Sequence, residues 1–337
     1  MEKIRLGIAG CGIAARRLHW PALEKLDEYY RIVGVTNRTK EKAVSFAELA
    51  GGAEVFDSYK DLIASEKLDA VDLALPIELN PDFIEKAAAK GIDVICEKPI
   101  APDVERGVKV VDLADNTDSV IYIAENFRHH RKLEKARELI EAGEIGEPLF
   151  VHRREFVGMT NENEFARTGW RKEPEHVGGF LSDGGVHHVA GLRRVLGEII
   201  GVSGYVTKVS DLPGKYDSMT LNLKFKNGVL GNYLVSYGIG GDKQYRIWGE
   251  EGSIEIEDGF VRLIDGEQVE TFDVDENDGF LEEFRDFYEV VKGDKTNNLG
   301  NPREALMDLA VIEAGIKSAE DSRRVDVRNY IQAESTE

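Results

Sequence analysis

An aspartate and a histidine four residues apart, Asp183 and His187, have the spacing best suited to acid–base chemistry in this sequence of 337 residues. If a helix begins near Gly184, both side chains lie on one face of it. The carboxylate then orients the imidazole, which exchanges a hydroxyl proton near neutral pH. The spacing fits equally well an Asp183 that caps the helix, with His187 packed behind it. His188 faces elsewhere, and we expect it to be structural.

A lysine at the end of a buried strand is the second candidate. The apolar segment 93–96 runs into Glu97-Lys98-Pro99. Ligands of parallel sheets bind at the carboxyl ends of the strands. A cation there would stabilise an alkoxide as a hydride leaves carbon, and we expect Lys98 to act in this way. The alternative is a surface lysine paired with Glu97.

A glycine-containing loop, Gly10-x-Gly12-x-x-Ala15, closes the first strand and opens a helix. Gly10 permits the tight turn, Gly12 lets the backbone approach a pyrophosphate, and Ala15 keeps the helix close to the sheet. The helix N-terminus offers free N–H groups and a positive dipole end. In this strand–turn–helix context the loop predicts a dinucleotide site rather than a purely structural turn.

The end of the second strand should contact the adenosine ribose. An acidic residue there would bind the 2′-hydroxyl, but this sequence has Asn37-Arg38 instead. Arg38 is suited to a 2′-phosphate, with Thr39 or Lys40 helping. The pattern favours NADP(H), with NAD(H) still possible, over the alternative of a solvated surface arginine.

A metal site is not expected. Asp183 and His187 are both possible ligands, but no third ligand lies close to them in the sequence. Two cysteines, Cys11 and Cys96, are too few for a disulfide framework or a cysteine metal site. We expect both to be small buried side chains.

Strands and helices alternate through the first 126 residues, and this alternation predicts a parallel sheet covered on both faces. The expected strands are 4–9, 31–36, 71–75, 93–96 and 119–124, and the expected helices are 16–28, 41–50, 82–90 and 104–114. Pro21 indicates a kink or restart in the first of these helices.

After a helix at 132–142 the pattern changes to strands without intervening helices, which predicts a mostly antiparallel sheet. The expected strands are 150–157, 199–209, 220–225, 230–237, 245–249 and 253–257, and helices return at 279–291 and 303–320. Asn227-Gly228 indicates a hairpin turn. We therefore expect an α/β dinucleotide-binding domain at 1–126 and an α+β domain with an open sheet at 127–337.

The charge balance excludes two classes of partner. The chain has 43 basic and 63 acidic residues, a net charge of −20, which repels nucleic acid and anionic lipid. Apolar residues make up 42% and charged residues 31%, as in soluble globular proteins. Charge breaks the apolar runs well short of a membrane span. No signal-peptide pattern opens the sequence, so we expect a cytoplasmic protein.

Taken together, the motifs resemble the Gfo/Idh/MocA family, the group of glucose–fructose oxidoreductase, inositol dehydrogenase and rhizopine-catabolism proteins. The resemblance covers nearly the whole chain and depends on the order and spacing of segments 10–15, 73–76, 97–100, 125–128, 143–148, 170–171 and 178–187. It implies a Rossmann domain followed by an α/β domain whose open sheet mediates homodimers or homotetramers.

The resemblance also implies roles for residues. Lys98 corresponds to the family's active-site lysine, beside the nicotinamide and holding the reacting oxygen. Asp183 and His187 match Asp-x-x-x-His, in which the histidine is the general acid/base. The expected catalytic set is therefore Lys98, Asp183 and His187. The cofactor-binding set it implies is Gly10, Gly12, Ile13, Ala14, Asn37, Arg38, Leu75, Pro76, Asn80, Glu97, Lys98, Asn126, Trp170 and Arg171.

Two departures concern the substrate. Asn80 stands where many members have histidine, and Ala190 where many have aspartate. The expected activity is hydride transfer between NADP(H) and the hydroxyl or carbonyl carbon of a sugar, polyol or related small molecule. One alternative is a glycoside hydrolase that uses bound NAD for a transient oxidation. Another is a non-catalytic nucleotide sensor, which the complete set of three catalytic residues argues against.

Overall fold

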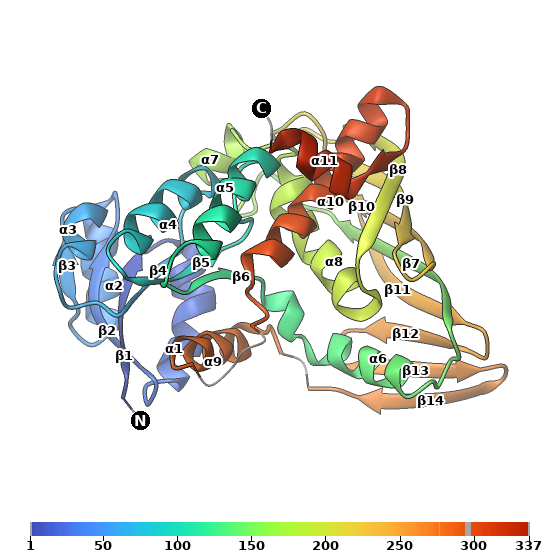
Figure 1. Cartoon of the computed structure of the whole chain (residues 1–337), viewed down its shortest axis with the longest axis horizontal. Coiled ribbons are helices and arrows are strands. Elements are labelled where there is room, and N and C mark those ends of the chain that lie inside the picture. The colour runs from blue at the N-terminus through green and yellow to red at the C-terminus, as the bar shows by residue number, and fades with distance from the viewer. Residues whose placement is uncertain (1, 276, 294–297, 336–337) are drawn as a thin grey trace. The chain divides into compact units, whose positions relative to one another are not determined.

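Strand β1 (Ile4–Ala9) lies near the centre of a six-stranded sheet in the computed structural model, which describes residues 2–275, 277–293 and 298–335 (Figure 1). The strand order is β3-β2-β1-β4-β5-β6 and every pair is parallel. The other strands are β2 (Tyr30–Thr36), β3 (Glu54–Phe56), β4 (Ala70–Leu73), β5 (Asp93–Glu97) and β6 (Ile121–Ala124). This order is that of a doubly wound dinucleotide-binding sheet, so the predicted Rossmann-type α/β fold is confirmed.

The helices of this sheet follow the expected alternation, with one irregularity. The helix expected over 16–28 is divided: a π-helical turn, η1 (Ala15–His19), precedes α1 (Trp20–Lys25), which carries Pro21 in its first turn. The remaining helices are α2 (Lys40–Leu49), α3 (Tyr59–Ile63), α4 (Asn80–Ala88) and α5 (Val104–Asp115), with short 3₁₀ turns at η2 (Ile77–Leu79) and η3 (Asn126–His129). The short β3 and α3 were not expected.

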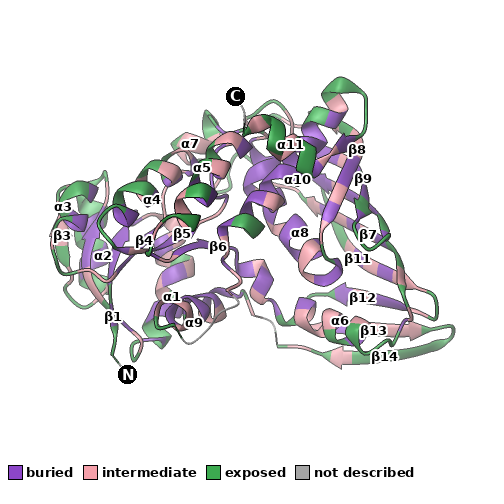
Figure 2. Cartoon of the chain, in the orientation of Figure 1, coloured by how far each residue is buried: buried purple, intermediate pink, exposed green. Residues whose placement is uncertain are grey.

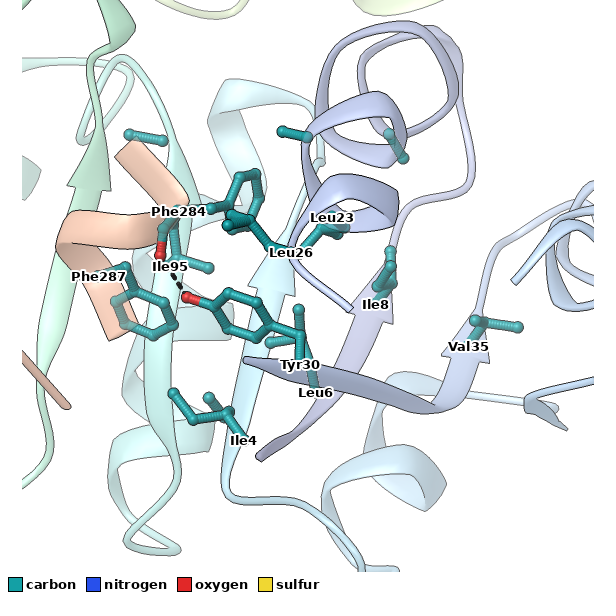
Figure 3. Close-up of a cluster of buried hydrophobic side chains, with 14 of the residues drawn as sticks. Ile4, Leu6, Ile8, Leu23, Leu26, Tyr30, Val35, Ile95, Phe284 and Phe287 are labelled. Atoms are coloured by element: carbon teal, nitrogen blue, oxygen red, sulfur yellow. Dashed lines mark hydrogen bonds between the residues drawn. The ribbon is translucent and has the colours of Figure 1, made fainter. Parts of the chain in front are cut away.

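A late helix, α9 (Phe280–Val291), completes the core of the first unit. Figure 3 shows Phe284 and Phe287 of this helix beside Tyr30, whose hydroxyl donates a hydrogen bond of 2.5 Å to the carbonyl of Phe284. The first compact unit is therefore Met1–Pro102, Arg106–Asn126 and Gly279–Leu306. The sequence led us to expect a second domain of 127–337. In the structure Gly279–Leu306 belongs to the first unit, because the aromatic face of α9 packs against the parallel sheet.

The second unit is built on a nine-stranded sheet. Its order is β14-β13-β12-β11-β7-β10-β9-β8-β15, and only β7 and β10 pair in parallel among its described strands. The strands are β7 (Pro148–Val157), β8 (Ile199–Thr207), β9 (Ser218–Phe225), β10 (Leu230–Ser236), β11 (Gly240–Gly249), β12 (Ser253–Glu257), β13 (Phe260–Asp265), β14 (Gln268–Asp273) and β15 (Val325–Asp326). The predicted mostly antiparallel sheet is confirmed, as is the hairpin turn, where Gly228 has φ +98°.

Helices of the second unit leave part of the sheet uncovered. They are α6 (Arg131–Glu141), α7 (Gly169–Lys172), α8 (Phe180–Leu196), α10 (Pro302–Asp321), whose first turn belongs to the first unit, and α11 (Val327–Glu334). Along β7, Val151 and Glu155 are buried while Phe150 and Val157 are exposed, and β14 is exposed along most of its length (Figure 2). In the described part of the chain, none of the helices has the length and apolarity to span a membrane.

Candidate active site

The glycine loop forms an open cradle at the end of β1. Gly10 has φ +97°, and a Cβ atom there would clash with the carbonyl oxygen of Ala74. A Cβ atom at Gly12 would meet nothing within 4 Å, so the space above the start of the helix is open. Ala15 is fully buried. The loop therefore has the shape and free backbone that a pyrophosphate requires.

Asn37 ties this loop to the end of β2. Its Oδ1 accepts a hydrogen bond of 3.0 Å from the Cys11 N–H, and its Nδ2 donates one of 2.9 Å to the Thr39 carbonyl. Arg38, the next residue, is exposed and makes no hydrogen bond or ion pair with any residue that the structure describes. Lys40, by contrast, pairs with Asp57 at 2.6 Å. Arg38 is thus the cation at this strand end whose charge is not compensated by a neighbour.

The Lys98 loop leaves the carboxyl end of β5 with a fixed backbone. The Lys98–Pro99 peptide bond is cis. Asn80 is fully buried, and its Nδ2 donates to the carbonyls of Glu97 and Pro99, both at 2.9 Å. The sequence led us to expect Asn80 at the cofactor. The structure places its amide nitrogen under the loop, where it holds the residues on either side of Lys98.

The remaining expected cofactor positions of the first unit lie at the same edge of the parallel sheet. Leu75 and Pro76 follow β4 and are half-buried, and Asn126 follows β6 and is buried. Ile13 and Ala14 open the helix after the glycine loop and are half-buried. The carboxyl ends of β1, β2, β4, β5 and β6 therefore bring the expected residues of this unit together.

A buried histidine that sequence reasoning missed lies beneath this edge. His19 has no exposed surface; its Nδ1 lies 2.8 Å from Asp72 Oδ2 and its Nε2 lies 2.9 Å from Glu97 Oε1. Burial lowers the pKa of His19, but the two carboxylates outweigh that effect and raise it well above its ordinary value. In the sequence, the feature that could have indicated a buried partner such as His19 is Asp72, a lone charge inside the apolar strand β4.

In the second unit, Asp183 lies in the first turn of α8 and is paired with an arginine. Arg171 Nε donates to Asp183 Oδ2 at 2.6 Å, and its Nη2 lies 3.4 Å from Oδ1. The guanidinium carbon also lies 3.9 Å from the ring centroid of Trp170. The segment expected near the cofactor thus holds the aspartate, and α8 begins at Phe180 rather than near Gly184.

His187 stacks on an aromatic ring. Its ring centroid is 4.6 Å from that of Phe127, with the two planes 20° apart, and the side chain is partly exposed. His188 is buried, and its Nδ1 lies 2.8 Å from the Tyr233 hydroxyl. Burial lowers the pKa of His188 to about 3, so this ring is neutral and structural, as expected.

The side chains behind α8 are also buried. Arg153 Nη1 donates to the His188 carbonyl at 2.7 Å, and its Nε donates to Glu155 at 3.0 Å. Arg154, on the opposite face of β7, pairs with Asp242. The Tyr237 hydroxyl is buried, with no hydrogen-bond partner among the described residues.

No group of three or more His, Cys, Asp or Glu residues could hold a metal ion in the described ranges.

Comparison with known proteins identifies the family. Residues 4–125 match the family model described as "Oxidoreductase family, NAD-binding Rossmann fold", and residues 137–327 match "Oxidoreductase family, C-terminal alpha/beta domain". An oxidoreductase of known structure from Thermotoga maritima is 48% identical, with a TM-score of 0.94, over 98% of this chain and 100% of that one.

Two curated relatives also extend over nearly the whole chain. An uncharacterised Saccharomyces cerevisiae protein is 33% identical over 95% of this chain and 97% of its own length. A protein of Haloferax volcanii named D-xylose 1-dehydrogenase (NADP(+)) 2 is 26% identical over 96% of this chain and 98% of its own length. These matches confirm the resemblance drawn from the motifs: the chain belongs to the Gfo/Idh/MocA family of NAD(P)-binding oxidoreductases.

Proposed function

We propose that this oxidoreductase transfers a hydride between NADP(H) and the hydroxyl or carbonyl carbon of a sugar, polyol or related small molecule. The observation that carries the proposal is the position of Lys98, on a fixed loop at the same sheet edge as the open cradle over Gly12. A cation at that edge would be next to the reactive end of a dinucleotide whose pyrophosphate lies on the loop.

The chain's residues fit the dinucleotide. Backbone N–H groups at the helix start after Gly12 would bind the pyrophosphate. Arg38 would bind a 2′-phosphate, which supports NADP(H) over NAD(H), and the Haloferax relative is named for NADP(+). Leu75, Pro76 and Asn126 would flank the remainder of the cofactor. When bound, the nicotinamide supplies the hydride acceptor or donor.

Two side chains would act on the reacting oxygen. The Lys98 ammonium stabilises negative charge that develops there as the hydride leaves the carbon. His187 removes the hydroxyl proton in the oxidative direction and returns it in the reductive direction. Phe127 fixes the plane of the His187 imidazole by stacking on it. The partial exposure of His187 leaves its imidazole accessible to a substrate. Asp183, held by Arg171, lies one turn before His187 on α8, where its carboxylate would orient the imidazole.

A substrate screen tests the proposal. Purified protein is offered NADP⁺ or NAD⁺ with aldoses, polyols and sugar acids, and the reduced nicotinamide is followed by absorbance. The expected result is turnover with at least one compound and a higher kcat/KM with NADP⁺. The alternative is a glycoside hydrolase that uses bound NAD for a transient oxidation. It predicts no net turnover in either direction, an NAD that co-purifies with the protein, and release of an aglycone from glycosides.

The proposal includes a homodimer or homotetramer formed through the uncovered face of the nine-stranded sheet. Leu230, Phe150 and Trp248 are adjacent across β10, β7 and β11, and the first two are 52% and 42% exposed. A row of exposed apolar side chains on a sheet face is typical of an interface. Light scattering should give a mass above that of the monomer for the wild-type protein and a lower mass for Leu230→Asp. A monomeric wild-type protein would contradict this part of the proposal.

A further inference from the structure

The helix that follows the glycine loop contains an unusual turn. Residues Ala15–His19 form a π-helical turn, in which one more residue is accommodated than in an α-helical turn. Such turns are rare in proteins overall, but many of those that occur lie at functional sites. This turn ends on His19, whose side chain is completely buried below the sheet edge. The last residue of this turn therefore faces β4 and β5, where its ring nitrogens meet Asp72 and Glu97.

Both ring nitrogens of His19 face carboxylate oxygens, Asp72 Oδ2 at 2.8 Å and Glu97 Oε1 at 2.9 Å. A neutral imidazole has one donor and one acceptor, so it can satisfy only one of two ionised carboxylates. An imidazolium donates to both. The geometry is therefore that of a buried cation that bridges two anions on neighbouring strands.

The surroundings of His19 are apolar and otherwise acidic. The rings of Phe280 and Phe284 lie 6.0 and 5.3 Å from it, centroid to centroid. Glu283, on the same helix α9, is fully buried, and its two carboxyl oxygens have no hydrogen-bond partner among the described residues. Burial raises the pKa of Glu283 well above its ordinary value; the charges of Glu97, Glu125 and Asp72 add to the rise, and the charge of His19 opposes it.

The position of His19 joins two parts of the site. It lies on the turn that begins at Ala15, the last residue of the glycine loop, and it binds Glu97, the residue before Lys98. We propose that His19 is a positioning residue that couples the dinucleotide loop to the Lys98 loop, by bridging Asp72 and Glu97 as an imidazolium. This inference rests on the proposed function, because it assigns a reactive role to Lys98.

The first test follows the His19 imidazole by NMR, with its signals assigned by their loss in His19→Gln, and does not depend on turnover. In protein labelled with ¹⁵N-histidine, the expected spectrum at neutral pH shows a proton on each ring nitrogen of His19. Titration with NADPH should shift both signals, because the ligand would bind the same helix. A His19 ring with a single N–H, or signals that do not respond to saturating NADPH, would overturn the proposal.

The second test uses variants and a matched control. In His19→Gln, kcat should fall by roughly 10²-fold, the size expected when a reacting group is displaced by about 1 Å, while NADPH affinity is little changed. Phe287→Leu is the control, because Phe287 is fully buried in the same core but makes its edge-to-face contact with Tyr122 rather than with His19. It should lower the melting temperature with little effect on kcat.

A double variant tests whether His19 acts through Glu97. If it does, His19→Gln combined with Glu97→Gln should have a kcat close to that of the slower single variant. Fully multiplicative effects, or a His19→Gln protein with the kcat of Phe287→Leu, would overturn the coupling. A wild-type protein without any oxidoreductase activity would contradict the proposed function alone, since the imidazole spectrum is measured independently of turnover.

Discussion

Arg171 and Asp183 form a two-point ion pair, with Nε 2.6 Å from Oδ2 and Nη2 3.4 Å from Oδ1. The side chains are 15% and 9% exposed, so the pair is largely removed from water. Two-point pairs between an arginine and a carboxylate are strong and hold the carboxylate in one orientation. The aspartate of the Asp-x-x-x-His motif is therefore held from one side by a short helix that precedes it in sequence.

Removal of this arginine should destabilise the second unit. Arg171→Gln leaves a nearly buried carboxylate without its cation, at a cost on the order of 3 kcal/mol in the free energy of unfolding. Urea denaturation measures the loss. Arg328→Gln is the matched control, because Arg328 also makes two bonds to a carboxylate, Glu198, but is 57% exposed. Equal losses in the two variants would show that burial of the Arg171 pair has no energetic consequence.

Replacement of His187 should remove the proton exchange and leave cofactor binding intact. We expect His187→Ala to lower kcat by roughly 10²–10⁴-fold, the usual contribution of general acid–base catalysis. The loss should be smallest at high pH in the oxidative direction, where the alcohol ionises more readily. The measurement is kcat against pH for both proteins, with NADPH affinity from fluorescence as the control. Wild-type turnover by the variant would exclude His187 as the acid/base.

Arg38→Ala should change the preference between the two dinucleotides. Loss of a charge-assisted bond to the 2′-phosphate costs about 1.5–3 kcal/mol, or roughly 10- to 100-fold in the Kd of NADPH. The Kd of NADH should be unaffected. Lys40→Ala should weaken NADPH binding less than Arg38→Ala does, since Lys40 is already paired with Asp57. If Arg38→Ala weakens both dinucleotides equally, Arg38 does not contact the 2′-phosphate.

Glu313 of α10 should make stability depend on pH. Its Oε2 accepts hydrogen bonds from the Val104 N–H at 3.3 Å and the Tyr330 hydroxyl at 3.1 Å. Burial raises the pKa of Glu313 to about 8, although these two hydrogen bonds lower it. The negative charges of Asp103 and Glu334 add to the rise. The folded state therefore retains a proton that the unfolded chain loses near its ordinary pKa of 4.5.

Because the folded state binds more protons, the free energy of unfolding falls as pH rises between about 4.5 and about 8. Glu313→Gln should remove this slope and be more stable than the wild-type protein above about pH 8, by a few kcal/mol at most. Denaturant melts across this range measure the effect. Glu320→Gln, on the same helix but paired with Lys215 near the surface, should not flatten the curve. Parallel curves for Glu313→Gln and the wild-type protein would contradict the assignment.

The parallel sheet and the glycine loop were predictable because local sequence determines them. Buried strands give apolar runs, and Gly10 adopts a positive φ that only glycine tolerates beside the Ala74 carbonyl. The return of α9 to the first unit was not predictable. Its periodicity shows which face of the helix is buried, but not that Phe284 and Phe287 pack against the parallel sheet.

The candidate site residues named from the sequence stay a prediction, and the sequence did not indicate the contacts between them. Helix α8 begins at Phe180, before the start near Gly184 that we supposed from the sequence, and it includes Gly184 and Gly185. Both lie inside the helix, where a Cβ atom would crowd Tyr237 and Ile312. The bridge from His19 to Glu97 depends on a π-helical turn, which the usual 3.6-residue periodicity does not anticipate.

Hydride transfer at an oxygen held by Lys98 can be tested by comparing the wild-type protein with Lys98→Met on the best substrate of the screen. We predict that the wild-type protein reduces NADP⁺ and that Lys98→Met binds NADPH normally but turns over roughly 10²–10³-fold more slowly, the loss typical of one oxyanion-stabilising group. Turnover by Lys98→Met at the wild-type rate would exclude Lys98 as the group that holds the reacting oxygen.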